Sequence, residues 1–133
     1  AELVFGRAWR IGEDHPIEYK PFEEMWKGSA LCHQALFTRV DLLRAKPLPT
    51  CYRIAGDYAF IVRATVEGYH FARLDLAVAR VELGGVSDLS PILRIWERYA
   101  ICRKYFRDAP IHRYYWKELW KRTKQKYLKR QEG

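Results

Sequence analysis

The sequence predicts an α/β fold, in which strands and helices alternate along one chain. Stretches whose apolar residues alternate with polar ones, as in a strand, take turns with stretches whose apolar residues recur at helical spacing. Glycine and proline separate these stretches, and 133 residues are enough for one domain with a buried core. Such an order of elements is typical of an α/β or α+β layer, a sheet packed against helices.

In the first part of the chain we expect two strands and two short helices. The first strand rests on Leu3, Phe5 and Trp9, which partly alternate with polar residues. The first helix rests on Pro21, which suits an opening turn, and on Gly28, which ends it. The expected bounds are residues 2–11 for the first strand, 21–28 for the first helix, 31–38 for the second strand and 40–46 for the second helix.

A third helix is expected from Asp57 to Glu67, with Gly68 as its C-terminal cap. Its inward face is expected to hold Phe60, Ile61, Ala64 and Val66. Residues 69–83 then follow the pattern of one or two strands, and the glycine pair at 84–85 breaks this pattern.

Two more helices are expected after the glycine pair. One begins near Leu89, with Ser87 or Asp88 as its cap, and the other runs over residues 111–129. The apolar side of the helix that begins near Leu89 is expected to hold Ile92, Leu93, Trp96, Tyr99 and Ala100, widened by Ile95, Cys102 and Phe106.

The charge distribution, the cysteines and the lack of long apolar runs indicate where the basic residues lie in the chain and which compartment the protein occupies. Residues 1–88 hold 11 Lys and Arg against 12 Asp and Glu, whereas residues 89–133 hold 13 against 4, so the basic character belongs to the end of the chain. The three cysteines form no Cys-x-x-Cys pair, which fits a reducing compartment and predicts three small buried side chains. No run of about 18 apolar residues and no signal peptide pattern is present, and a cytoplasmic location is expected.

Asp57 is the first candidate for chemistry. It lies where a loop becomes a helix, directly after Gly56, and two interpretations stay open for it. As a helix cap it would accept hydrogen bonds from free amides, which is worth about 1 kcal/mol. As a general base it would take a proton from a substrate hydroxyl, and the helix N-terminus would help to keep it ionised.

His33 and Gln34 follow Cys32 inside an apolar run. Buried polar side chains need partners, so one interpretation is a hydrogen-bonded core histidine. The other interpretation places the pair on the floor of an active-site cleft.

Farther on, Gly84, Gly85 and Ser87 form either a simple turn or a loop whose amides approach a phosphate. No metal-ligand motif is found among the scattered histidines and cysteines.

The last helix combines aromatic and basic residues. An interfacial helix on an anionic membrane is one interpretation, and a solvated helix packed on its own domain is another. Nucleic-acid binding is not expected, because no recognised DNA- or RNA-binding module is present. The residues that would form the membrane-binding tail are Arg113, Trp116, Lys117, Trp120 and Lys121.

Four pieces, taken in order and with their spacing, resemble family 2 glycosyltransferases of the bacterial polysaccharide type. They are Glu-Leu-Val-Phe-Gly-Arg at residues 2–7, Cys-His-Gln-Ala-Leu-Phe at 32–37, Tyr-Arg-Ile-Ala-Gly-Asp-Tyr-Ala-Phe at 52–60 and Ala-Arg-Val-Glu-Leu-Gly-Gly-Val-Ser at 79–87. The resemblance covers nearly all of residues 2–88. It implies the C-terminal portion of a GT-A-like mixed sheet with flanking helices, followed by a helical extension over residues 89–133.

The resemblance implies an inverting glycosyltransferase, which moves a sugar from a nucleotide-diphosphate donor to a hydroxyl of a saccharide or lipid-linked acceptor. Asp57 matches the position of the family's catalytic base, where Gly56 replaces a glutamate that is frequent in the family. The other implied roles are acceptor binding by Cys32, His33, Gln34 and Arg53, and closure over the donor diphosphate by Gly84, Gly85 and Ser87.

The family's nucleotide-binding strands and its Asp-x-Asp element have no counterpart in this sequence. We therefore expect residues 1–88 to be the acceptor-side half of the catalytic domain, inactive alone and prone to self-association through the apolar surface that the missing half would cover. Mg²⁺ or Mn²⁺ is expected in the full-length enzyme, with no ligand in this chain. The alternative function is an accessory domain that binds a membrane or a partner through the basic aromatic tail.

Overall fold

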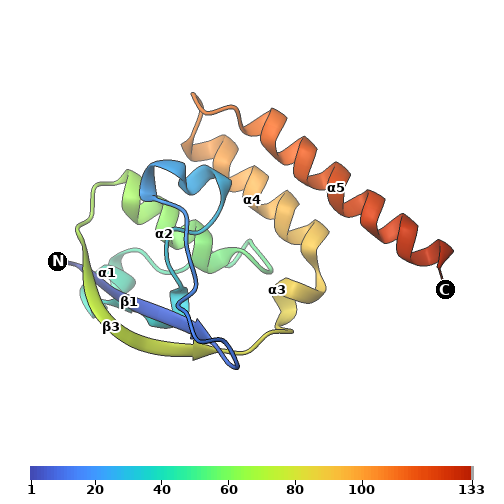
Figure 1. Ribbon diagram of the computed structural model, residues 1–133. Helices are drawn as coiled ribbons and strands as arrows, with labels where there is room; N and C mark the ends of the chain where they lie inside the picture. Colours follow the sequence, from blue (N-terminus) through green and yellow to red (C-terminus); the bar gives the residue numbers. More distant parts are fainter. Residues whose placement is uncertain (133) are drawn as a thin grey trace.

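The computed structural model describes residues 1–132, and the side chains of residues 86 and 87 lie outside the described part. Its strands and helices form a mixed α/β arrangement, in which α2 lies between a small sheet and the helices α4 and α5 (Figure 1). The elements in chain order are β1 (Leu3–Arg10), η1 (Phe22–Lys27), η2 (His33–Ala35), β2 (Leu36–Thr38), α1 (Val40–Ala45), α2 (Gly56–Val66), β3 (Phe71–Val81), α3 (Val86–Leu89), α4 (Pro91–Tyr105) and α5 (Ile111–Gln131).

The described strands form one mixed sheet in the order β2-β1-β3. β2 runs antiparallel to β1, and β3 runs parallel to it. The register of β1 with β3 shifts on both sides of Arg7, next to Gly6. A Cβ atom at position 6 would overlap the Val78 side chain and lie 3.0 Å from the Leu76 carbonyl oxygen, so the close approach of the two strands requires glycine here.

The core joins the sheet to every long helix. Leu3 of β1, Met25 of η1 and Val62 of α2 are fully buried and belong to the same apolar cluster as Ile101 and Cys102 of α4. Burying such side chains is the main driving force for the fold, at about 1.5–3 kcal/mol each. Two tyrosine hydroxyls in the core also hold η1 in place by directional hydrogen bonds. Tyr58 donates to the Met25 carbonyl at 2.6 Å and Tyr115 to the Trp26 carbonyl at 2.7 Å.

The helices α4 and α5 lie side by side, joined by a short turn that contains Pro110 (Figure 1). Ile111 and Tyr115 fix the first turns of α5 in the core, whereas residues 120–132 are all exposed and project beyond the rest of the molecule. The division of the chain at residue 88 stays a prediction. No described helix is long and apolar enough to cross a membrane.

Most of the elements expected from the sequence are confirmed, including the first strand, the helix at 40–46 and the single long strand within 69–83. The second strand is wrong in part. His33–Ala35 form a 3-10 turn, and only Leu36–Thr38 pair with β1. An apolar run does not distinguish a strand from a tight buried turn, and the turn exposes His33 and Gln34.

Other expectations about faces and caps are also wrong. Val66 is half-exposed at the end of α2. The N-cap of α2 is Ala55, so Asp57 lies inside the first turn. The helix expected near Leu89 is two helices, α3 and α4, with Ser90 as the N-cap of α4. The buried residues of α4 are Ile95, Ile101 and Cys102, whereas Leu93, Trp96 and Ala100 are exposed. Cys32 and Cys102 are buried as expected, but Cys51 is exposed.

Candidate functional site

A cleft of about 700 Å³ lies where η2, the start of α2, the end of β3 and α4 meet. This volume is within the range of small-molecule sites. The segments that form it are far apart in the sequence, so its walls are assembled by the fold. Its charged and hydrogen-bonding side chains include Arg10, Tyr19, His33, Gln34, Arg53, Asp57, Glu82, Asp88, Arg94 and Arg98.

An aspartate–histidine pair is at the centre of the candidate site. Asp57 Oδ2 lies 2.6 Å from His33 Nδ1, a short charge-assisted hydrogen bond. The other carboxylate oxygen, Oδ1, accepts the backbone N–H of Tyr58 at 2.8 Å. The Asp57 side chain is 31% exposed and His33 is 55% exposed, so both can be reached from the cleft. Each carboxylate oxygen keeps a lone pair for a further donor.

The surroundings keep Asp57 ionised. Burial raises the pKa of this carboxyl group, but the hydrogen bond and charge of His33 outweigh burial and the pKa lies below its ordinary value. The Tyr58 amide and the positive charge of Arg98 act in the same direction. For His33, the hydrogen bond to Asp57 raises the pKa of the imidazole, and burial only partly offsets it. The pair therefore combines a carboxylate with an imidazole that is readily protonated.

The loop before α2 is held by Glu97, a residue of α4. Its carboxylate accepts the backbone N–H groups of Arg53, Ile54 and Ala55 at 2.7, 2.8 and 2.7 Å. Hydrogen bonds to a charged acceptor are the stronger kind, at about 1.5–3 kcal/mol each. Because this loop leads directly into the first turn of α2, Glu97 fixes the position from which Asp57 enters the cleft.

Two arginines on α4 add positive charge to the same cleft. Arg94 and Arg98 are four residues apart, so they share a helix face, and both line the cleft. Burial lowers the pKa of Arg94, and the neighbouring charge of Arg98 lowers it further. Arg94 lies 3.6 Å from the Asp88 carboxylate. The guanidinium group of Arg98 lies over the Tyr58 ring, and its Nε is buried with no hydrogen-bond partner. Two guanidinium groups at one wall favour an anionic ligand.

Most site residues expected from the sequence come together here. Asp57 and the four acceptor-side candidates all line the cleft, with Cys32 largely buried beneath it. Gly85 also lines it, between β3 and α3. Gly84 does not line it and gives its N–H to the Asp88 carboxylate at 3.0 Å. The Ser87 side chain lies outside the described part of the chain. The exposure of His33 rules out the core-histidine interpretation.

Arg94, Arg98 and Glu97 were not foreseen as site residues. The two arginines carried a usable signal, since a spacing of four puts them on one helix face. Glu97 carried none, because its partners are 42–44 residues away in the sequence.

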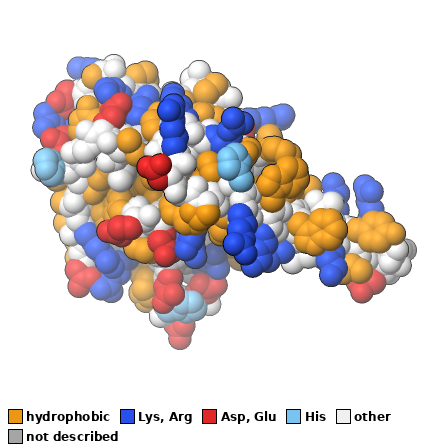
Figure 2. Space-filling model, turned by 90° about the horizontal axis from the view of Figure 1, so that it is seen from above, with side chains coloured by type: hydrophobic (Ala, Val, Ile, Leu, Met, Phe, Trp, Pro, Cys, Tyr) orange, Lys and Arg blue, Asp and Glu red, His pale blue; other side chains and the backbone are white. Residues whose placement is uncertain are grey.

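The tail candidates lie elsewhere, on α5. Arg113, Trp116, Lys117, Trp120 and Lys121 do not line the cleft, and all five are exposed. Trp120 is the most exposed of the large apolar side chains of α5, at 72%. Figure 2 shows hydrophobic side chains (orange) and basic side chains (blue) next to one another on the projecting part of this helix.

Among residues 1–132, no group of three or more His, Cys, Asp and Glu side chains comes together in a way that could hold a metal ion. Mg²⁺ or Mn²⁺ in a full-length enzyme, with its ligands outside this chain, stays a prediction.

Comparisons with protein-family models, with curated proteins and with solved structures found no match to this chain.

Proposed function

We propose that this chain is part of an inverting glycosyltransferase, which moves a sugar from a nucleotide-diphosphate donor to an acceptor hydroxyl in polysaccharide or glycoconjugate synthesis. The observation that carries the proposal is the ionised Asp57 in a cleft of small-molecule size, paired with His33 at 2.6 Å. The same proposal includes the fold: the mixed sheet would be the C-terminal portion of a GT-A-like sheet.

In the proposed reaction, the acceptor hydroxyl attacks the anomeric carbon of the donor sugar from the face opposite the leaving diphosphate. Asp57 accepts the hydroxyl proton through a free lone pair as the new C–O bond forms. The glycosidic bond to the diphosphate breaks at the same time, and the bonding electrons leave with the diphosphate. Configuration at the anomeric carbon is inverted, because attack and departure occur on opposite faces.

His33 is assigned the role of orienting Asp57. Its Nδ1–H fixes Oδ2, so the remaining lone pairs of the carboxylate have a defined direction. Gln34 and Arg53, exposed on the same cleft, are assigned to the hydroxyl groups of the acceptor. Both offer several N–H donors, and Gln34 also offers an acceptor oxygen, which suits a polyhydroxylated ligand.

Another part of the cleft is assigned to the donor. Gly85, Arg94 and Arg98 line it together, and a diphosphate is an anion that guanidinium groups bind well. Charge that develops on the leaving diphosphate would be stabilised there. The rest of the donor site and the divalent cation are assigned to polypeptide outside this sequence, so the chain of 133 residues is expected to be inactive alone.

The test is a transfer assay on the natural protein that contains this chain, with a panel of nucleotide sugars and mono- and disaccharide or lipid-linked acceptors. Release of nucleoside diphosphate together with a glycosylated acceptor is the expected result. The same assay on the chain alone should give no product. Failure of the natural protein to cleave any nucleotide sugar on the panel, with any acceptor, would contradict the proposal, and so would turnover by the isolated chain.

A further inference from the structure

A stripe of aromatic side chains lies on the outer surface of the α4–α5 hairpin. It consists of Trp96 from α4 and Trp116, Trp120 and Tyr127 from α5, which we call the aromatic stripe. All four are among the exposed large apolar residues, with Trp116 62% and Tyr127 63% exposed. The spacings of four and seven residues along α5 put its three members on one helix face. None of the four lines the cleft around Asp57.

The aromatic stripe is surrounded by positive charge. α5 holds eight lysines and arginines within Ile111–Gln131, against the single acid Glu118. Lys117, Lys121 and Lys124 follow the stripe on the side of the helix next to it, and Figure 2 shows the two kinds of side chain interleaved. The surface that meets this helix must therefore be negatively charged and must also accept aromatic rings.

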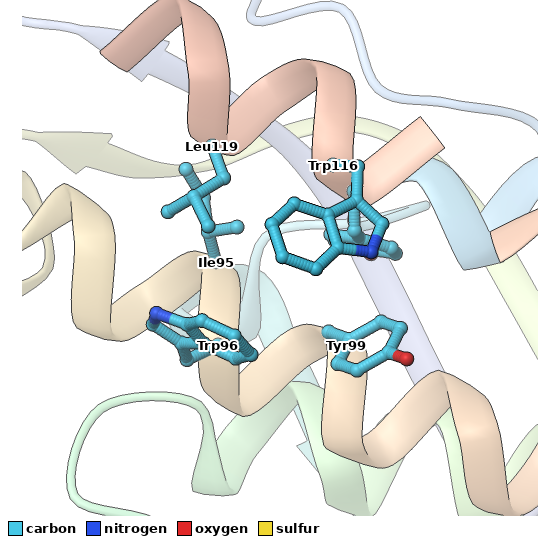
Figure 3. A pocket seen from close by; sticks show the side chains of 6 residues that line it. Ile95, Trp96, Tyr99, Trp116 and Leu119 are labelled. Carbon is cyan, nitrogen blue, oxygen red and sulfur yellow. The ribbon is translucent and has the colours of Figure 1, made fainter. Parts of the chain in front are cut away.

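The stripe has a fixed position on the molecule. Tyr114 and Tyr115 on the inner side of α5 donate hydrogen bonds to the carbonyls of Lys27 and Trp26, at 3.0 and 2.7 Å. On the outer side, the Trp116 ring meets Trp96 edge to face, with ring centroids 6.4 Å apart (Figure 3). The notch between these rings, Tyr99 and Leu119 measures only about 20 Å³, too small for a ligand. The rings therefore act through their outward surface.

We propose that the aromatic stripe and the neighbouring lysines dock this protein on the surface of an anionic phospholipid bilayer, with α5 lying along the headgroups. Tryptophan and tyrosine rings have an apolar body and a polar group, which suits the depth of the headgroups. The lysine stems extend past them, so their ammonium groups reach the lipid phosphates. This inference is independent of the proposed function.

A nucleic acid is the other polyanion to which basic and aromatic residues can bind. Bases stack on the open faces of aromatic rings. Here Trp96 and Tyr99 meet edge to face, as Trp96 and Trp116 do, so neighbouring rings cover part of the faces. The exposed Leu93 and Leu128 add aliphatic surface to the same hairpin, which a bilayer buries and a base does not use. The observations therefore favour the bilayer.

The test is co-sedimentation of the full chain with vesicles of phosphatidylcholine alone and of equal parts phosphatidylglycerol and phosphatidylcholine. We expect binding only to the vesicles that contain phosphatidylglycerol. Lys117→Glu/Lys121→Glu should weaken it by at least about tenfold. Trp116→Ala/Trp120→Ala should also weaken it, with an unchanged far-UV circular dichroism spectrum. Arg44→Glu/Arg73→Glu is the charge-matched control on α1 and β3, away from α5, and should bind almost as the natural sequence does.

A second measurement needs no variant. Brominated phosphatidylglycerol vesicles should quench the tryptophan fluorescence of the natural sequence, because Trp96, Trp116 and Trp120 would enter the lipid. Three results would overturn the proposal: no binding to either vesicle, an equal loss of binding in the Arg44→Glu/Arg73→Glu control, or binding to single-stranded RNA with indifference to vesicles. Binding without quenching would also overturn it, because the rings would then stay outside the bilayer.

Discussion

His33 Nδ1 lies 2.6 Å from Asp57 Oδ2, although the two residues come from separate elements, the turn η2 and the first turn of α2. The contact joins two of the segments on which the sequence resemblance rests, residues 32–37 and 52–60. Its acceptor is a carboxylate whose pKa lies below the ordinary value, so the contact is charge-assisted.

The His33–Asp57 pair predicts a specific pH dependence of stability. The pKa of His33 is raised from 6.5 and that of Asp57 is lowered from 3.8. Because the pKa of the His33 imidazole is raised in the folded protein, this group stabilises the fold fully below its ordinary pKa. That stabilisation is lost as the pH rises through the pKa of the folded state. Because the pKa of the Asp57 carboxyl group is lowered in the folded protein, this group stabilises the fold fully above its ordinary pKa. That stabilisation is lost as the pH falls through the pKa of the folded state. The pair therefore stabilises the fold most between about pH 4 and about pH 6.5.

His33→Gln keeps a hydrogen-bond donor but removes this titration. The measurement is the free energy of unfolding by urea at about pH 5.5 and about pH 8.5, for the natural sequence and the variant. We expect the natural sequence to exceed the variant in free energy of unfolding by less at the higher pH than at the lower one. His112→Gln is the control, because that histidine faces Tyr99 and not a carboxylate. An equal difference in free energy of unfolding at both pH values would show that protonation of the imidazole is not coupled to Asp57.

Glu97→Gln tests the support of the loop before α2. The variant keeps one acceptor oxygen but loses the charge and the second oxygen, while Glu97 holds three backbone N–H groups of residues 53–55. We expect the free energy of unfolding to fall by about 1–3 kcal/mol. Glu118→Gln is the control, since Glu118 makes only a 3.4 Å contact with Lys121 on the surface of α5. Equal, small losses in both variants would contradict the role of Glu97.

Gly6→Ala tests the close approach of β1 and β3. The added methyl group would overlap the Val78 side chain and press on the Leu76 carbonyl, so the strands would have to separate. We expect a loss of about 1–3 kcal/mol in the free energy of unfolding, measured by denaturant titration. Gly28→Ala is the matched control, because the nearest atoms to a Cβ there are 3.8 Å away, at ordinary contact distance. A Gly6→Ala variant as stable as the control would contradict the strand geometry.

Local signals in the sequence predicted much of the fold. Proline at 21, the glycines at 28 and 68 and the alternation within residues 71–81 place elements that the structure contains. They failed where burial depends on distant partners. Residues 31–38 are mostly apolar and were expected as one strand, but only residues 36–38 of this run pair with β1, and residues 33–35 form a 3-10 turn. The buried face of α4 was misjudged, because apolar residues lie on more than one side of that helix and packing against α5 and α2 selects which of them are buried.

The candidate site was predictable to a similar extent. The Gly56–Asp57 step at a helix start drew attention to Asp57, and the polar pair at 33–34 drew attention to His33. The sequence contained no sign that the two side chains touch, since 24 positions separate them. The link between Glu97 and the loop at 53–55 is equally non-local, because a single glutamate on a helix carries no sequence signal for three amide partners elsewhere in the chain.

The most direct test of the account is the rate of sugar transfer by the natural protein that contains this chain, carrying Asp57→Asn. Asparagine keeps the size of the side chain but cannot take up the acceptor proton. We expect kcat to fall by about 10²- to 10⁴-fold, with an unchanged circular dichroism spectrum. Asp41→Asn, an exposed change on α1 at the Arg39–Asp41 pair, should leave kcat unchanged. Undiminished transfer by a correctly folded Asp57→Asn protein would contradict the central claim.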